Sequence, residues 1–506
     1  MRVMLASWAL AAALALHGAD AFSPSGVQLP ASRLTSSSMP LAARPAAFWA
    51  PAAKRAGATQ LHMAATVPKI IQGGMGVQVS SWKLAREVGR KGELGVISGT
   101  AMDVVLLRWL QEGDPGGLYR KALATFPDQG MAQRCIAKYF VEGGKDKAKP
   151  YKPLQMWVME PSQELNEISV MGNYCEVWLA KHNDDGTPIE SVIGINCLTK
   201  IQLPVMSSLY GAMLADGDYV LMGAGIPMEV PGILDRLSRN EDVKMAIDVD
   251  DAVLLASAML KRATGEGPTR GIQGFVIEFP TAGGHNAPPR GFKYDATTGS
   301  HALSLNDKGE PIYGPKDEVD LVKFKNAVGD LPFYLAGYYA RPEKLQEVLA
   351  LGGAGVQVGT SFAFSEESGL WDQAKQQVLQ QIANDDLVVY TDPVASPTGF
   401  PFKVLELDGS LSVKDNYEER PRVCNLGYLR TAYEKDGKLG YRCASEPIDD
   451  YLKKGGDKSA TEGRKCLCNG LMANAGVPQV SPFKKAGEDS RYVEETLITA
   501  GDDVNQ

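Results

Sequence analysis

Short apolar or β-branched runs that alternate with stretches of helical periodicity constrain this chain most. Many of these runs end in Gly or in another small or polar residue, which is typical of buried parallel strands. The candidate strands are Ile70–Gln72, Leu94–Ser98, Val192–Asn196, Tyr219–Met222, Met245–Asp248, Phe275–Phe279, Phe333–Ala336 and Val356–Val358. Alternating strands and helices predict a parallel sheet, and eight strands are the number found in an α/β TIM (β/α)8 barrel.

Two helices fit this interpretation. One is expected to begin at Arg341, with Pro342 in its first turn, and to end at Gly352-Gly353. The other is expected from Ser162 to Lys181. Its apolar stripe predicts burial against the barrel wall rather than a partner-binding face, and consists of Ile168, Met171, Cys175, Trp178 and Leu179.

The rest of the chain departs from a minimal barrel. We assign residues 64–390 to the barrel and expect a long loop over Asn286–Val328, which is rich in Pro, Gly, Lys and Asp. From Thr391 onward the alternation of strands and helices is lost, and four of the seven cysteines lie there. Residues 391–506 are therefore expected to form a small C-terminal accessory region.

The N-terminal residues resemble targeting signals. Residues 1–21 contain Arg2, an apolar run and Ala19-Asp20-Ala21, a pattern typical of a signal peptide. Residues 22–63 lack Asp and Glu and are rich in Ser, Ala and Pro, as transit peptides are. A signal peptide followed by a transit peptide that starts with Phe resembles the bipartite plastid signal of algae with secondary plastids. We therefore expect a plastid (chloroplast) protein whose mature chain starts near Ala64, with secretion as the alternative.

Charge and hydropathy exclude two classes of partner. The formal net charge is -8, so no broad basic surface is expected for nucleic acid. Apart from the signal peptide, no stretch approaches the roughly 18 uncharged apolar residues of a membrane span. The oligomeric state is not indicated by the sequence.

Glycine clusters suggest a phosphate site. Gly73-Gly74-Met75-Gly76 follows the first strand, but Val79 stands where a dinucleotide fingerprint needs its third glycine. Gly337 ends the seventh candidate strand and Gly359-Thr360 ends the eighth. Barrels bind phosphate at the carboxyl ends of these two strands. The alternative is that these are ordinary turn glycines.

One histidine stands out among the five. His285 ends Thr281-Ala282-Gly283-Gly284-His285, just beyond the candidate strand Phe275–Phe279. An imidazole at the carboxyl end of a barrel strand is well placed to act as a general base. A turn histidine that makes a structural hydrogen bond is the alternative.

Taken together, these motifs resemble the nitronate monooxygenase (2-nitropropane dioxygenase) family of FMN-dependent TIM barrels. The resemblance covers roughly Pro68 to Phe402. It implies that His285 is the catalytic base. The residues that it implies bind FMN are Gln72, Gly73, Asn196, Glu278, Gly283, Gly284, Gly337, Gln357, Val358, Gly359 and Thr360. Two positions differ from the family pattern: Glu278 stands where many members have Gln, and Tyr338 replaces the second glycine of Ala-Gly-Gly.

The activity implied by the resemblance is oxidation of an alkyl nitronate or nitroalkane with O2 to a carbonyl compound and nitrite. The flavin would supply the redox chemistry, and the protein would supply position and a base. Similar motifs occur in FMN-dependent enoyl and quinone reductases that use NAD(P)H, so this activity is the alternative. A third hypothesis is a non-enzymatic scaffold with a metal-binding cysteine region.

Cys424, Cys443, Cys466 and Cys468 gather in the accessory region. Four thiolates are able to hold zinc or an iron–sulfur cluster, but the spacing is not a repeated C-x2-C pair. Because Arg442, Arg464 and Lys465 are adjacent in sequence, a lowered thiol pKa and redox sensitivity form a second hypothesis. Buried free cysteines are the third, and we expect no metal.

Overall fold

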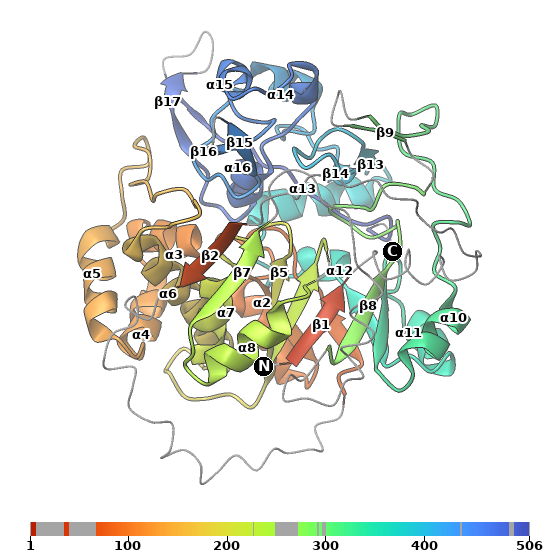
Figure 1. Cartoon of the computed structure of the whole chain (residues 1–506), viewed down its shortest axis with the longest axis horizontal. Coiled ribbons are helices and arrows are strands. Elements are labelled where there is room, and N and C mark those ends of the chain that lie inside the picture. Colours follow the sequence, from red (N-terminus) through yellow and green to blue (C-terminus); the bar gives the residue numbers. More distant parts are fainter. Residues whose placement is uncertain are drawn as a thin grey trace, which may run out of the picture.

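The computed structural model describes residues 2–6, 35–39, 67–225, 227–247, 272–290, 293–295, 300–435, 438–484 and 490–504. Its centre is a strongly curled parallel sheet (Figure 1). The order of its strands is β6-β5-β4-β3-β12-β11-β8. In chain order the strands are β3 (Ile70–Gln72), β4 (Leu94–Ser98), β5 (Val192–Leu198), β6 (Tyr219–Gly223), β8 (Gly274–Glu278), β11 (Phe333–Ala336) and β12 (Gly355–Val358). The predicted parallel α/β sheet is confirmed for these seven strands, with shifts of one or two residues at their ends.

The remaining candidate strand of the barrel lies elsewhere. β7 (Val243–Ile247) pairs antiparallel with β2 (Thr35–Met39), outside the curled sheet. The position between β6 and β8 is taken by β1 (Arg2–Ala6), which pairs parallel with both neighbours (Figure 1). The prediction that Met245–Asp248 is a barrel strand is therefore wrong for this structure. A segment of the predicted signal peptide completes the hydrogen bonding of the two sheet edges instead, because each edge strand carries unpaired N–H and C=O groups.

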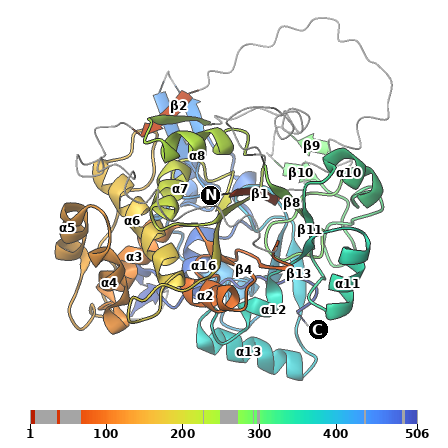
Figure 2. The same ribbon diagram turned by 90° about the horizontal axis from the view of Figure 1, so that it is seen from below.

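Helices pack around the outside of the sheet (Figure 2). They are α2 (Trp82–Arg90), α3 (Met102–Gln111), α4 (Leu118–Ala124), α5 (Gln129–Tyr139), α6 (Gln163–Ala180), α7 (Val205–Leu214), α8 (Val230–Ser238), α10 (Leu321–Val328), α11 (Pro342–Ala350), α12 (Thr360–Ala363) and α13 (Asp372–Ala383), with a 3-10 turn at Pro115–Gly117. Both predicted helices form. The Ser162 side chain accepts a hydrogen bond from Leu165 N and caps α6, which is buried along most of its length. Among the described residues, no helix is both long and apolar enough to span a membrane.

The segment predicted as one long loop has structure at its end. Its last residues form α10, with Asp320 as the N-cap, so the prediction of a loop as far as Val328 is wrong there. Phe324 on the buried face of α10 contacts Phe275 and Phe333 edge-on, which packs the helix against β8 and β11. Earlier in the segment, β9 (Lys293–Asp295) pairs with β10 (Ser300–Ala302).

A C-terminal region of short hairpins and helices lies over one end of the sheet (Figure 1). Its elements are β13 (Val389–Asp392), β14 (Phe402–Leu405), α14 (Lys414–Glu419), β15 (Thr431–Lys435), β16 (Lys438–Arg442), α15 (Ile448–Lys453), a 3-10 turn at Ser459–Thr461, α16 (Leu467–Asn474), β17 (Val480–Lys484) and β18 (Arg491–Val493). The paired strands β13 and β14, β15 and β16, and β17 and β18 are antiparallel. These antiparallel pairs differ from the parallel order of the central sheet.

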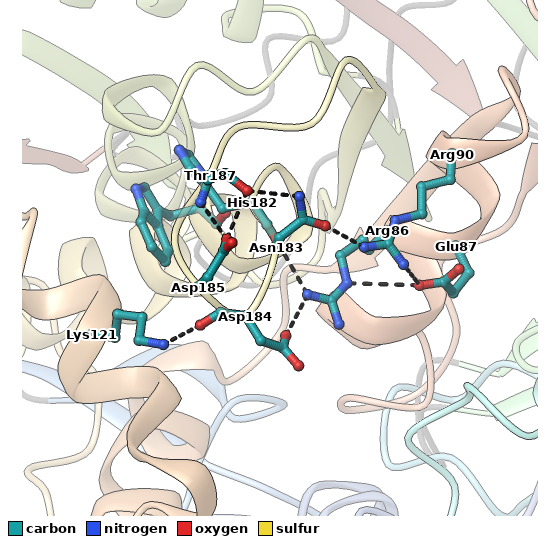
Figure 3. Close-up of polar contacts among 10 residues, drawn as sticks. Arg86, Glu87, Arg90, Lys121, His182, Asn183, Asp184, Asp185 and Thr187 are labelled. Carbon is teal, nitrogen blue, oxygen red and sulfur yellow. Dashed lines mark hydrogen bonds and ion pairs between the residues drawn. The ribbon is translucent and has the colours of Figure 1, made fainter.

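A polar network ties the turn after α6 to α2 at the periphery (Figure 3). Arg86 donates to Asp184 at 2.7 Å and to the carbonyl of His182 at 3.1 Å, while Arg90 donates to Asn183. The His182 ring stacks on Trp178 at 4.1 Å, and its Nδ1 lies 2.7 Å from the Trp178 carbonyl. His182 therefore has a structural role in this network.

Candidate active site at the carboxyl ends of the strands

A cavity of about 760 Å³ lies at the carboxyl ends of the parallel strands. We call these strand ends and the turns that follow them the rim. From the rim, the cavity is lined by Gly73, Gly74, Asn196, Lys200, Glu278, Gly283, Gly284, His285, Gly337, Gln357, Gly359 and Thr360, among others. Its opposite wall comes from the C-terminal region and includes Phe400, Phe402, Tyr428, Leu429, Leu467, Cys468, Leu471 and Ala500. A volume of this size suits an organic cofactor together with a small substrate.

The structure brings together most of the residues selected from the sequence. All of them line the cavity except Gln72 and Val358. Gln72 is fully buried; its amide donates to Ser80 Oγ at 2.8 Å, and its Oε1 accepts from Val96 N at 3.0 Å. Gln72 therefore fixes the first glycine turn to β4 and does not face the cavity.

The first glycine turn is shaped by its close approach to β5. A Cβ at Gly74 would lie only 2.3 Å from the Asn196 Cβ, a separation that side chains do not reach. Only glycine lets this turn pass over Asn196, which also places the Asn196 side chain at the cavity wall. The glycine at this position is thus required by packing.

Three strands carry a polar row across the cavity floor. Ala336 on β11 pairs in register with Glu278 on β8 and with Gln357 on β12. Because Ala336 has only a methyl group, the side chains on either side of it meet, and Gln357 Nε2 donates to Glu278 Oε1 at 3.2 Å. The family pattern with Gln at position 278 would replace this charged acceptor by a neutral amide.

The turn predicted to hold phosphate is already in contact with the C-terminal residues. Gly337 has φ +89°, and a Cβ there would lie 2.8 Å from Thr281 Oγ1 and 3.0 Å from the Ala282 backbone nitrogen. The Thr360 hydroxyl accepts from Gly501 N at 2.8 Å and also hydrogen-bonds Asp503, whose pKa is raised by burial. A phosphate at this turn would therefore lie near the Asp503 carboxyl group, with the Thr360 side chain already engaged.

Tyr338 follows Gly337 with φ +70°, a left-handed conformation that favours glycine. This is the position at which the resembled family has its second glycine. The tyrosine side chain is partly exposed and does not line the cavity. Tyr338 adopts this left-handed conformation at a cost of roughly 1 kcal/mol for a non-glycine residue.

His285 is held in place by the C-terminal region. Its Nε2 lies 2.7 Å from Ser396 Oγ, and its ring contacts Phe402 edge-on with centroids 4.8 Å apart. Burial and the charge of Lys200 lower the pKa of His285 to about 3. The imidazole is therefore neutral at ordinary pH and suited to hydrogen bonding, whereas a general base needs a conjugate acid of higher pKa to keep the proton.

Lys200 was missed in the sequence analysis. It lies two residues beyond the end of β5, lines the cavity, and has its ammonium group over the Phe400 ring. Burial lowers the pKa of Lys200 to about 7, so its charge changes near neutral pH. The rule that selected His285, a titratable residue just after a parallel strand, selects Lys200 as well once it is applied to β5.

The four accessory cysteines also come together. Cys424, Cys443, Cys466 and Cys468 line one small enclosed cavity beside the main one, and Cys468 faces both. Burial raises the pKa of each thiol, so the expected lowering by adjacent basic residues is not seen. Among the residues that the structure describes, no group of three or more His, Cys, Asp or Glu side chains is arranged to hold a metal ion.

No family model matches the chain, and no curated protein matches its sequence. Solved structures do match it. FabK from Thermotoga maritima is 16% identical over 70% of this chain and 75% of that chain, with a TM-score of 0.34. A nitroalkane oxidase from Streptomyces ansochromogenes is 16% identical over 67% and 76% of the two chains, with a TM-score of 0.34.

A third solved structure is the enoyl reductase domain of MlnA from Bacillus amyloliquefaciens, which is 12% identical over 68% of this chain and 64% of that chain, with a TM-score of 0.31. The structural neighbours of this chain thus include a nitroalkane oxidase and an enoyl reductase. At these identities and TM-scores the similarity assigns neither a fold nor an activity to this chain.

Proposed function

We propose that this protein is an FMN-dependent oxidoreductase that oxidises alkyl nitronates or nitroalkanes with O2. The observation that carries the proposal is the cavity at the rim, where the glycine turns and His285 meet. In the full proposal the mature chain forms a closed (β/α)8 barrel in the plastid.

The residues present fit a flavin mononucleotide. The absence of side chains at Gly73, Gly337 and Gly359 leaves backbone exposed to the cavity, which suits a planar ring and an anionic phosphate. Glu278 and Gln357 offer hydrogen-bonding groups beneath a planar ring. Bound there, FMN would supply the electron transfer from substrate to O2.

The chain's own residues would bind and orient the substrate. His285, neutral and fixed by Ser396, is able to hydrogen-bond a nitronate oxygen. Lys200 in its charged form places a cation close enough to lower the pKa of His285, which favours an anionic substrate such as a nitronate over a neutral one. The phenylalanines of the C-terminal wall exclude water from this corner.

A second candidate is an NAD(P)H-dependent enoyl or quinone reductase. The observation in its favour is the apolar opposite wall, formed by Phe400, Phe402, Leu429, Leu467 and Leu471. Such a wall suits an acyl chain or a quinone ring better than a short nitroalkane. This candidate shares the flavin and differs in the electron donor.

Anaerobic mixing separates the two. The purified full chain is mixed in a stopped-flow instrument with propyl-2-nitronate or with NADPH, and the flavin absorbance is followed. Rapid bleaching by the nitronate alone is the expected result. Bleaching by NADPH alone would establish the reductase, and protein without flavin would leave the scaffold hypothesis.

A further inference from the structure

We propose that the main cavity binds an anion that carries a medium-length alkyl chain. The charged head lies between Lys200 and His285, and the chain lies against the C-terminal region. With the proposed function as its basis, the substrate is the nitronate of a medium-chain nitroalkane rather than of a short one. The observation behind this is that polar and apolar side chains line different parts of the cavity.

Polar side chains that interact with one another line the cavity at β8 and β12. Glu278 on β8 accepts a hydrogen bond from Gln357 on β12. Thr360 follows β12 and hydrogen-bonds Asp503 of the C-terminal region. Because β8, β11 and β12 are neighbours in the sheet, these groups lie on one side of the cavity. This side suits the polar parts of a cofactor.

Aliphatic side chains line the cavity at β3, β4 and β5, which are also neighbours in the sheet. We call this part the apolar arm, and its residues are Val77, Ala101, Leu198, Ile201, Leu429 and Leu471. All six belong to, or pack against, one hydrophobic cluster, so they form a continuous apolar surface. Aromatic ligands are usually stacked on aromatic rings, whereas an arm of aliphatic side chains suits an alkyl chain.

Two hydroxyl groups beside the apolar arm are already hydrogen-bonded within the protein. The Tyr428 hydroxyl donates to the buried carboxyl group of Asp103, and the Ser98 hydroxyl donates to the Gly76 carbonyl. Burial raises the pKa of the Cys468 thiol, which therefore stays uncharged. An alkyl chain in the arm thus leaves neither hydroxyl group unpaired.

The charged head of the ligand is placed by Lys200 and His285. Lys200 directly precedes Ile201 of the apolar arm, and its ammonium group lies over the Phe400 ring. It is also close enough to His285, which follows β8, to lower the pKa of that imidazole electrostatically. A cation beside a neutral imidazole suits a planar anion with two oxygens, such as a nitronate or a carboxylate. The head site therefore adjoins the arm.

Titration with unreactive carboxylates tests this placement. Saturated carboxylates from acetate to decanoate, each below its critical micelle concentration, are titrated calorimetrically into the purified full chain. The pH is about 6, where Lys200 is charged because its pKa is about 7. We expect one carboxylate per chain and a Kd that falls about threefold for each added methylene group, so that octanoate binds about 100-fold more tightly than butanoate. Equal Kd values along the series, or no binding of octanoate, would overturn the proposal.

A variant that fills the apolar arm locates the chain. Leu471→Trp places a larger side chain on α16 and should weaken octanoate binding at least tenfold, with little effect on acetate. Leu452→Trp is the matched control, because Leu452 is an exposed residue of α15 that does not line the cavity. Equal octanoate affinity in the two variants would contradict the placement. If Leu471→Trp fails to fold, the chain-length series of the wild type still decides.

A second variant locates the head. Lys200→Met removes the cation and should weaken octanoate binding about tenfold, the scale of one hydrogen bond to a charged group, while the affinity for octanol stays unchanged. Unchanged octanoate binding would contradict the position of the head.

The titrations measure binding without turnover, so the two proposals are able to fail separately. Tight octanoate binding by a protein that oxidises no nitronate would refute the proposed function and support the alkyl-chain site. Oxidation of the nitronates of nitroethane and 1-nitrooctane with equal kcat/KM would support the proposed function and refute the alkyl-chain site.

Discussion

The rim and the C-terminal region hold the same cavity in different ways. At the rim, the backbone of tightly packed turns shapes the cavity. Gly74 and Gly337 are glycines because neighbouring atoms occupy the space that a Cβ would need. In the C-terminal region, side chains shape the cavity by contacting residues of the rim. Ser396 and Phe402 fix the His285 ring, and Thr499 Oγ1 accepts from Gly284 N at 2.7 Å.

This difference teaches where chemistry and selectivity reside. Rim positions are set by where strands end, so the parts that resemble a flavin site are placed by the fold itself. The C-terminal region positions the imidazole, forms one wall of the cavity and contacts Thr360 in the turn proposed to bind phosphate. Substitutions in the two regions should therefore have different effects on cofactor binding and on turnover.

The largest effect is expected at the contact between the two regions. His285→Ala should leave FMN bound and lower turnover of a nitronate by about 10²-fold, the scale of a lost catalytic hydrogen bond. Ser396→Ala keeps the ring but loses its 2.7 Å partner, so a smaller loss is expected. Steady-state kinetics at matched flavin content provides the measurement. Equal turnover in wild type and His285→Ala would remove His285 from the mechanism.

A rim glycine should affect cofactor binding. Gly337→Ala places a Cβ 2.8 Å from Thr281 Oγ1 and is expected to weaken FMN binding about 30-fold, since forcing a packed turn apart costs about 2 kcal/mol. Gly409→Ala is the matched control, because Gly409 also has positive φ but has open space around it. Titration of apoprotein with FMN compares them. Similar FMN affinities for both variants would show that the turn at Gly337 does not contribute to FMN binding.

The pH dependence of turnover should follow the charge of Lys200. Because burial lowers the pKa of Lys200 to about 7, its charge is present below that pH and is lost above it. Turnover of a preformed nitronate should therefore fall about tenfold as the pH rises from 6.5 to 8.5, on the scale of one lost charge. Lys200→Arg keeps its charge over this range, so its profile should be flat. Identical profiles for both proteins would exclude a role for the Lys200 charge.

The smallest effect on FMN binding is expected from Asp503, which hydrogen-bonds Thr360 in the turn proposed to bind phosphate. Asp503→Asn removes a carboxyl group that hydrogen-bonds Thr360 and should tighten FMN binding about fivefold, the scale of one nearby charge. Asp372→Asn removes an exposed carboxylate away from the cavity and serves as the control. Fluorescence quenching on FMN binding gives both affinities. Weaker binding by Asp503→Asn would indicate that Asp503 supports the site.

Features of the rim that depend on local sequence could be predicted, whereas features that depend on contacts between distant segments could not. Strand ends such as Gln72 and Ala336 were predictable because apolar runs and small residues mark them locally. Gln72 was nevertheless misplaced as a cofactor residue, since its role depends on a hydrogen bond to Val96 in the next strand.

Long-range contacts were beyond the sequence pattern. The bond between Gly284 and Thr499 joins residues 215 positions apart, and no periodicity predicts it. Pairing of β1 between β6 and β8 was equally unexpected, because the contact between Arg2–Ala6 and strands more than 200 residues away leaves no local pattern in the sequence.

Identification of the cofactor tests the central claim most directly. The purified protein is denatured, and the released small molecules are analysed by mass spectrometry and quantified against protein. One FMN per chain is the predicted result. Protein with no flavin, even after incubation with excess FMN, would contradict the account.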